Sequence, residues 1–409
     1  MLKATDRRLT AAATPPLGSQ VGGESPIREV GVQRISPHRR ACGFLRVGFG
    51  RGLGPASLTV AILLSSTGCA QDGRDPLGQA PFPRLTGDYL GQPLPGTEPE
   101  LFAPGVVSTG MYTRDLTMTP AGDEIYFGAS VGNFTYATIL VARRRDGVWS
   151  EPEVAGFARN PAYTYLEPFV HPTGQQLFFV SDQPDPLDPE REDHENIWVL
   201  DRTSSGWGPP RKLGTPVNSE LAEYFPSVTR DGTLYFTRED PETRQGGVFR
   251  CRYDGERYLE AERLPEQINS TPYVFNAYVT ADESFVIVPT FGREDSYGHA
   301  DYYVCFRRTD PTSPAGDAWS EPVNLGPRVN TTRGDEWSCS LSPDGRYFFF
   351  MSARLLDSVL EPGAGLTRRR LFEMHNRPGH GLASIYWMEA GFLDSLRADV
   401  RSRDASEMD

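Results

Sequence analysis

The sequence lacks an apolar run long enough to cross a membrane as a mature helix. The run at 56–64 has nine residues, and a spanning helix needs about 20. Basic residues are also scarce beyond residue 68. Removing the nine Lys/Arg and three Asp/Glu of residues 1–68 from the totals of 41 and 54 leaves 32 against 51, a net charge near −19. Such a surface repels nucleic acid and anionic membranes, which excludes nucleic-acid binding.

Cysteine is equally scarce. Past Cys69 the chain holds three cysteines, an odd number, at Cys251, Cys305 and Cys339. We expect them to serve as small buried hydrophobic residues, although the sequence leaves a bridge between two of them open. No His-x-x-x-His or similar ligand spacing is present, so no transition-metal site is predicted.

One acidic loop is the only candidate for a cation. It runs from Ser181 to Glu195 and is rich in aspartate and glutamate. Its spacing matches no EF-hand loop, so we interpret it as a solvated surface loop and predict no cofactor. The alternative is a Ca²⁺ site at this loop.

Turn residues and short apolar strands are what the sequence does contain, and they recur. A strand, a tight turn of the Pro-Asp-Gly kind and a second apolar strand appear five times, at 118–127, 170–179, 228–236, 279–287 and 340–350. The fourth copy is degraded, because Glu283 stands where the others have the turn glycine. A repeat made only of strands and turns indicates a propeller or another β-array.

Each copy is followed by a third apolar strand and by an aromatic residue close to proline or glutamate. The third strands lie at 138–142, 196–200, 247–251, 301–305 and 384–388. Four strands in roughly fifty residues make one propeller blade. The sequence therefore predicts an all-β, five-bladed propeller of four-stranded antiparallel blades, with six blades as the alternative. The recurrent aromatic residues are assigned to contacts between blades.

The ends of the repeat region predict how the ring closes. The fifth copy has no fourth strand after it, and an orphan strand-like segment, 99–108, precedes the first copy. We expect this segment to join the last blade, which removes the open sheet edges. The propeller then spans 99–390. Residues 391–409 form a polar C-terminal tail, either a short helix or disordered.

Residues 1–68 form an N-terminal extension and signal segment. A basic region, the apolar run and small residues up to Gly68 predict secretion. Gly68-Cys69 resembles a bacterial lipobox, which implies an acylated Cys69, and Ala70 after it implies the outer membrane. One alternative is an ordinary signal peptide that is cut near Ala70, so that the protein is secreted. Another is that translation begins near Val47. A third is a twin-arginine signal at Arg39-Arg40. Residues 69–98 are predicted to be a flexible tether. The predicted location is thus the cell envelope, periplasmic or at the outer membrane.

The repeats resemble the TolB-like, WD40-like PD40 β-propellers. Ser-Pro-Asp-Gly-x-x-Phe-Phe-Phe at 342–350 carries the resemblance, with its four variants and the Trp-Ser-x-Pro turns at 149–152 and 319–322. Val-Asn-Ser-like motifs at 217–219, 268–270 and 329–331 also fit. The resemblance covers about 99–390. It implies a binding or scaffold module of the cell envelope, and similar repeats also occur attached to peptidases, so function must be argued from the site.

A candidate site follows from strand direction. In a four-stranded meander, the start of strand 1 and the loop between strands 2 and 3 lie at the same end of the blade. The residues predicted to surround the channel mouth on that face are Asp115, Glu167, Glu223, Asn276 and Glu336. They serve either to cap turns and join blades, or to bind a ligand. The variable loops on the same face also carry His194, His299, His375 and His380, and such clustered loops are where binding usually resides.

Catalysis is the weaker hypothesis. The Gly-x-Ser-x-Gly match at 128–132 lacks the strand–turn–helix setting of a hydrolase and is interpreted as chance. Glycoside cleavage by two of Glu167, Glu223 and Glu336 is the runner-up, because it needs only two suitably separated carboxylates. We expect a non-catalytic propeller that binds an envelope protein, peptide or glycan through its loop-bearing face, with a membrane contact only through the lipid anchor.

Overall fold

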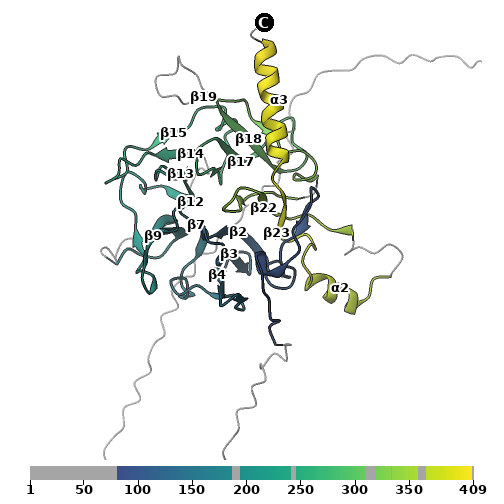
Figure 1. Cartoon of the computed structure of the whole chain (residues 1–409). Coiled ribbons are helices and arrows are strands. Elements are labelled where there is room, and N and C mark those ends of the chain that lie inside the picture. Colours follow the sequence, from purple (N-terminus) through teal and green to yellow (C-terminus); the bar gives the residue numbers. More distant parts are fainter. Residues whose placement is uncertain are drawn as a thin grey trace, which may run out of the picture. The chain divides into compact units, whose positions relative to one another are not determined.

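The computed structural model describes residues 81–186, 194–240, 246–308, 318–332, 334–357 and 365–407. Its strands form five small antiparallel sheets arranged as a five-bladed β-propeller (Figure 1). The prediction of five blades is therefore confirmed. In the part of the chain so described, no helix combines the length and apolar character needed to cross a membrane.

Each blade is an antiparallel meander whose strand 1 lies nearest the ring axis (Figure 1). Blade 1 contains β2 (Tyr112–Met118), β3 (Glu124–Val131), β4 (Tyr136–Arg145), β5 (Val148–Trp149) and β6 (Glu153–Val154). Blade 2 contains β7 (Tyr165–Val170), β8 (Gln176–Ser181), β9 (Asn196–Thr203), β10 (Gly206–Trp207) and β11 (Arg211–Lys212). Blade 3 contains β12 (Ala222–Val228), β13 (Leu234–Glu239), β14 (Gly246–Cys251) and β15 (Glu262–Arg263).

The remaining blades follow the same plan. Blade 4 contains β16 (Tyr278–Val279), β17 (Phe285–Phe291), β18 (Ala300–Arg308), β19 (Ala318–Trp319) and β20 (Val323–Asn324). Blade 5 contains β21 (Cys339–Leu341), β22 (Tyr347–Ser352), β23 (Ser384–Glu389) and, as its outer strand, β1 (Glu100–Leu101). In blades 1, 2 and 4 the fourth strand is split into two short pieces that both pair with strand 3.

The ring closes as the sequence predicts. β1 pairs antiparallel with β23, with Glu100 opposite Trp387 and Leu101 opposite Tyr386. The segment that precedes the first blade thus completes the last one, and the outer edge of β23 is covered. Phe102, which follows β1, packs its ring against Phe349 and Trp387 at centroid distances of 5.0 and 5.1 Å.

The apolar core lies between the blades. Five clusters of buried residues occur, one at each contact between neighbouring blades. Burying both sheet faces in this way is the physical reason for the ring, because an isolated small sheet leaves one face in water. The C-terminal helix α3 (Phe392–Glu407) adds Leu393 and Val400 to the cluster between blades 4 and 5. The short elements η1 (Tyr89–Gly91) and α2 (Arg368–His375) complete the structure.

The Val-Asn-Ser-like motifs connect strands within a blade. The side-chain amide of Asn269 accepts a hydrogen bond from the Val248 N–H at 2.8 Å and donates to the Val248 and Leu264 carbonyls at 3.1 and 2.7 Å. Asn218 makes the same contacts with Ile197 and Leu213. Asn330 likewise exchanges two bonds with Tyr302. These buried amides satisfy backbone groups where the short outer strand ends.

The degraded turn of blade 4 keeps the geometry of the other turns. Glu283 adopts φ +58°, in the left-handed region that the turn glycines Gly122, Gly174 and Gly345 occupy elsewhere. The strain of a side chain there is offset by contacts. Its carboxylate accepts a hydrogen bond from the Tyr235 hydroxyl of blade 3 and pairs with Arg307 at 2.6 Å.

Candidate functional site: the channel mouth and the loop face

We call the face that carries the starts of strand 1 and the loops between strands 2 and 3 the loop face, and the opposite face the turn face. All five residues predicted for the channel mouth are buried: Asp115, Glu167, Glu223, Asn276 and Glu336. Strand pairing shows that they occupy two positions of the repeat, not one, because Glu223 and Glu336 lie two residues earlier in their blades than the other three. These five residues therefore do not form a ring of equivalent positions.

Strand 1 carries a bulge at the same position in blades 1, 2 and 3. The pairing of β2, β7 and β12 with strand 2 shifts at Asp115, Glu167 and Phe225, which all have positive φ near +55°, and Asn276 shares this conformation. Phe225 and Ser338 thus occupy the positions that the sequence comparison gave to Glu223 and Glu336. Because the bulge is common to these blades, it does not cause the offset. Counting back three residues from Met118, Val170 and Val228 gives Asp115, Glu167 and Phe225, so the sequence prediction placed Glu223 two residues too early.

Arg114 is the centre of a network that joins blades. Its guanidinium lies 2.7 Å from Asp115 Oδ1 and 2.9 Å from Oε1 of Glu167 in blade 2. The second oxygen of Glu167 accepts the N–H of Phe225 in blade 3 at 2.7 Å. On the other side, the Asp115 N–H donates to the Ser338 hydroxyl of blade 5 at 3.2 Å. The network therefore crosses four of the five blades.

Glu223 and Glu336 make contacts inside their own blades. Glu223 accepts hydrogen bonds from Ser219 and pairs with Arg238 at 2.7 Å. Glu336 accepts from the hydroxyls of Thr331 and Ser352 at 3.0 and 2.8 Å. These two acids hold the loop that leads into strand 1 against strand 2.

Burial dominates the electrostatics of these acids. It raises the pKa of Glu336 to about 7, against the lowering effect of the Ser352 and Thr331 hydrogen bonds. Burial also raises the pKa of Glu167, where Arg114 acts in the opposite direction. The pKa of Glu223 is raised by burial as well, despite its bonds to Ser219 and Arg238. In the described residues, Oε2 of Glu336 and Oδ2 of Asp115 have no hydrogen-bond partner.

Aromatic side chains fill the ring axis. Phe169 of blade 2 and Tyr278 of blade 4 belong to blades that are not neighbours, yet their ring centroids are 6.4 Å apart. The space beside Asp115, lined also by Ser338 and Ser340, is too narrow to admit a water molecule. The three glutamates are thus held by protein partners around a filled axis. The Gly-x-Ser-x-Gly serine, Ser130, is a buried residue of β3 with no helix after it.

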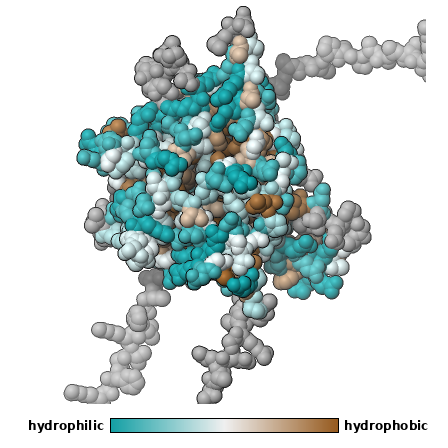
Figure 2. Space-filling view, in the orientation of Figure 1, coloured by the Kyte–Doolittle hydropathy of each residue, from teal (hydrophilic) through white to brown (hydrophobic). Residues whose placement is uncertain are grey.

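The loop face carries most of the exposed apolar residues. Twelve large hydrophobic residues are exposed in the described part of the chain. Topology places nine of them on the loop face: Met111, Val131, Tyr136, Tyr273, Tyr297, Leu366, Leu371, Phe372 and Leu382. They come from blades 1, 4 and 5, which are consecutive around the ring. The molecular surface is otherwise mostly hydrophilic in the view of Figure 2.

The helix α2 is the most exposed element of this face. It lies in the loop between β22 and β23 at the edge of the ring (Figure 1), and none of its residues is buried. Phe372 is 68% exposed and Leu366, just before the helix, 73%. Arg368 and Arg369 stand beside them and are also exposed. The sequence prediction named His375 and His380 in this loop, whereas the Leu371-Phe372 pair was missed because its exposure depends on the tertiary structure.

The other predicted features give a mixed outcome. Cys69 lies outside the described residues, as do residues 187–193 of the acidic loop. Within the described part, no group of three or more potential ligands is placed to hold a metal ion. His375 and His380 lie together with ring centroids 5.7 Å apart. Cys251, Cys305 and Cys339 are free and buried, which confirms their assignment as small core residues.

Comparison with known proteins assigns neither a family nor an activity to this chain. No family model matches this chain, and no curated protein matches it. Similar solved structures include a thermostable family-43 glycoside hydrolase, with 12% identity and a TM-score of 0.39 over 70% of this chain and 92% of that chain. A GH43 endo-arabinanase from Bacillus licheniformis has 12% identity and a TM-score of 0.40 over 68% and 93%. A puromycin hydrolase has 12% identity and a TM-score of 0.34 over 59% and 36%.

Proposed function

We propose that this protein is a non-catalytic propeller of the cell envelope that is anchored through Cys69 and binds a protein partner through its loop face. The signal-like segment and Gly68-Cys69 support the location and the anchor. The resemblance to PD40 repeat propellers supports the role of a binding module. The observation that carries the proposal is that nine of the twelve exposed large hydrophobic residues in the described part of the chain lie on one face.

The chemistry of α2 suggests the kind of partner. Leu371 and Phe372 offer apolar anchors, and Arg368 and Arg369 are exposed next to them. A short helix of this kind binds a partner by laying its apolar side chains into a groove. The chain as a whole has a net charge of −13, so α2 presents cations on an acidic protein. The partner is expected to combine an apolar groove with an acidic rim.

The state of the channel-mouth acids favours binding over glycoside cleavage. Hydrolysis needs two carboxyl groups roughly 5–10 Å apart on either side of a bound sugar. Glu167 is engaged by Arg114 and by the Phe225 N–H, and Glu223 by Arg238 and Ser219. The aromatic contact of Phe169 with Tyr278 lies across the axis of the ring. Glu167 thus joins neighbouring blades, and Glu223 fixes the loop that leads into its own blade.

Site-specific photo-crosslinking in cells tests the proposal. A photoreactive residue at Phe372 should give a discrete adduct with an envelope protein. The same residue at Ser204, which is exposed on the turn face, serves as the control and should not. Leu371→Asp should abolish the adduct, whereas Leu259→Asp, at an exposed apolar residue away from the loop face, should leave it intact.

Two results would contradict the proposal. One is an adduct that forms equally from Phe372 and Ser204, or that survives Leu371→Asp. The other is release of reducing sugar from a glycan panel by the purified protein, lost in Glu336→Gln or Glu167→Gln. The anchor is tested separately, because Cys69→Ala should move the protein from the membrane fraction to the soluble fraction.

A further inference from the structure

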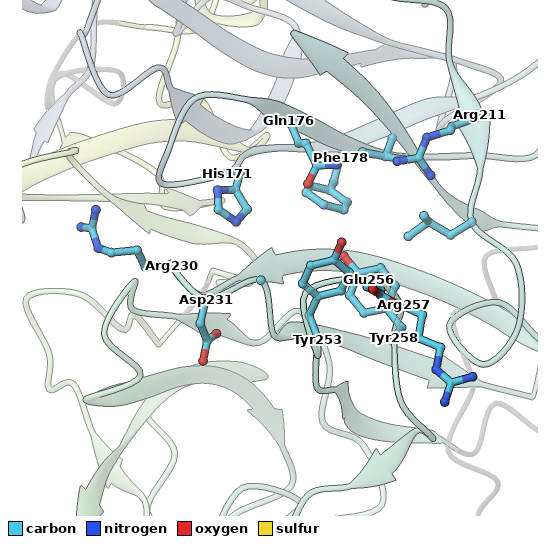
Figure 3. Close-up of a pocket in the computed structure, with 13 residues that line it drawn as sticks. His171, Gln176, Phe178, Arg211, Arg230, Asp231, Tyr253, Glu256, Arg257 and Tyr258 are labelled. Carbon is cyan, nitrogen blue, oxygen red and sulfur yellow. The ribbon is translucent and has the colours of Figure 1, made fainter.

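A cavity of about 370 Å³ opens between blades 2 and 3 on the turn face (Figure 3). It lies away from the loop face, because the turns β7–β8 and β12–β13 and the segment after β14 border it. Its volume is within the range of small-molecule sites, roughly 300–1,000 Å³. No part of the proposed partner surface contributes to it.

The walls of the cavity are apolar and aromatic. Phe178, Val199 and Leu213 of blade 2 form one side and are buried. Tyr253 and Tyr258 of blade 3 lie opposite, with ring centroids 5.3 Å apart (Figure 3). These walls suit a ligand with a flat or apolar body, because aromatic faces provide contact area at little entropic cost.

Gly232 lets one of these tyrosines pack closely on the β12–β13 turn. A Cβ added at Gly232, where φ is +95°, would lie 2.9 Å from Cδ1 of Tyr253. The backbone of the β12–β13 turn therefore packs directly against the Tyr253 ring. The aromatic wall is preformed rather than assembled around a ligand.

Cationic groups lie at both ends of the cavity. Arg230 borders one end beside His171, and Arg211 and Arg257 border the other (Figure 3). Arg211 faces Asp201 at 3.3 Å and Arg257 faces Asp254 at 3.6 Å. The side chain of Arg230, in contrast, has no hydrogen-bond or ion-pair partner among the described residues. It also stands where the turns of blades 1, 2 and 5 have proline, so the repeat does not require it.

His171 provides a directed donor next to Arg230. Its Nδ1 accepts the backbone N–H of Thr173 at 3.1 Å, which places the proton of the neutral ring on Nε2. Burial lowers the pKa of His171, and Arg230 lowers it further. The ring is therefore a neutral N–H donor near pH 7, and no acceptor for Nε2 occurs in the described part of the chain.

Asp231 is the acidic residue nearest this end, and its charge raises the pKa of His171 against the effects of burial and Arg230. Asp231 accepts hydrogen bonds from the Thr229 hydroxyl at 2.5 Å and from the Thr233 N–H at 3.1 Å. Glu256 is exposed to solvent. The Nε2–H of His171 is left for a ligand oxygen. Figure 3 shows the Arg230 side chain extended away from the aromatic walls, so its exposed guanidinium, which is unpaired among the described residues, meets a ligand at this end through a change of rotamer. A planar guanidinium matches a carboxylate.

We propose that this cavity binds a small organic carboxylate. The carboxylate meets Arg230 and His171, and the apolar or aromatic body lies between Phe178 and the two tyrosines. The site is independent of the partner surface on the loop face, so either can exist without the other.

Calorimetric titration of the full chain at low ionic strength tests the site. The probe is 3-phenylpropionate, with its neutral amide, 3-phenylpropionamide, and inorganic phosphate as matched comparisons. We expect a Kd on the order of 1 mM for the carboxylate, which corresponds to a modest free energy per atom for a fragment of this size. Affinity of the amide or of phosphate should be at least about tenfold weaker, equivalent to about 1.4 kcal/mol.

Variants locate the binding. Arg230 is exposed, so the Arg230→Gln variant should fold normally. Its Kd for 3-phenylpropionate should be about tenfold higher than that of the wild type. Tyr258→Ala should weaken the binding of the carboxylate and leave the affinity for phosphate unchanged. Arg346→Gln, at the exposed turn of blade 5, is the matched control and should have no effect. Equal affinity for the amide or for phosphate, no measurable binding of the carboxylate, or an unchanged Kd in Arg230→Gln would overturn the proposal.

Discussion

The guanidinium of Arg114 in blade 1 lies 2.9 Å from a carboxylate oxygen of Glu167 in blade 2, and both side chains are buried. Asp115 shares the same guanidinium at 2.7 Å. One cation thus compensates two buried acids from neighbouring blades. This relationship makes the ring sensitive to charge changes at its centre.

Replacing Arg114 by leucine should strongly destabilise the propeller. The change leaves Asp115 and Glu167 buried without their cation, a situation that typically costs about 3–5 kcal/mol. Urea unfolding monitored by tryptophan fluorescence measures the loss. Arg144→Leu, whose pair with Asp88 is exposed on the acidic side, is the control and should change stability by less than about 1 kcal/mol. Equal effects of the two substitutions would show that the central network contributes no more than a surface pair.

Stability should fall as the pH rises toward and through 7, in part because of Glu336. Its pKa is raised to about 7 in the folded protein, above the value of about 4.3 for an unperturbed glutamate. The folded state therefore binds this proton more tightly than the unfolded state. The contribution to stability is full below the unfolded pKa and is lost as the pH rises through the folded pKa.

Glu336→Gln tests this dependence. The variant should lose less stability than the wild type between pH 5 and pH 8, by on the order of 3 kcal/mol. Urea midpoints at the two pH values measure the difference. Glu153→Gln, at an acid whose side chain is 56% exposed, should follow the wild type. A pH profile of Glu336→Gln that matches the wild type would contradict the assignment.

Phe169 and Tyr278 should be energetically coupled, although no strand connects them directly. Their rings meet with centroids 6.4 Å apart across the axis, and such aromatic pairs contribute about 0.5–1.5 kcal/mol beyond their buried area. A double-mutant cycle with Phe169→Ala and Tyr278→Ala should give a coupling in this range. The pair Phe169→Ala and Phe127→Ala, whose side chains belong to different core clusters, should be additive within about 0.5 kcal/mol. Additivity of the first pair would mean that the rings make no effective contact.

Asn269→Ala should destabilise blade 3 by about 2–3 kcal/mol. The substitution leaves the buried Val248 N–H and the Leu264 carbonyl without these partners, and each such group costs about 1–3 kcal/mol. The Val248 carbonyl loses one bond but still accepts the Leu264 N–H at 3.0 Å. Asn269→Asp should also be destabilising, because a carboxylate can accept from the Val248 N–H but cannot donate to the carbonyls. Thermal unfolding measures both. A neutral Asn269→Asp would show that the two donated bonds contribute nothing.

The sequence by itself determined the repeat, the four strands of each blade and the closure of the ring by Glu100–Leu101. These features depend on turn residues and on alternating apolar residues. Both are local patterns, so they can be recognised in a short stretch of sequence. The equivalence of Asn218, Asn269 and Asn330 was visible in the same way. Their hydrogen bonds reach strands only a few tens of residues away, within the same repeat.

Only the tertiary structure decided the state of the channel mouth. The bulges at Asp115, Glu167 and Phe225 shift the register by one residue, and no residue type announces such a bulge. The contact between Phe169 and Tyr278 and the cavity beside Arg230 join residues of different blades. Their separations depend on how the sheets stack around the axis. The distance between stacked sheets depends on the volumes of many side chains that are far apart in the sequence. No local sequence pattern specifies this distance.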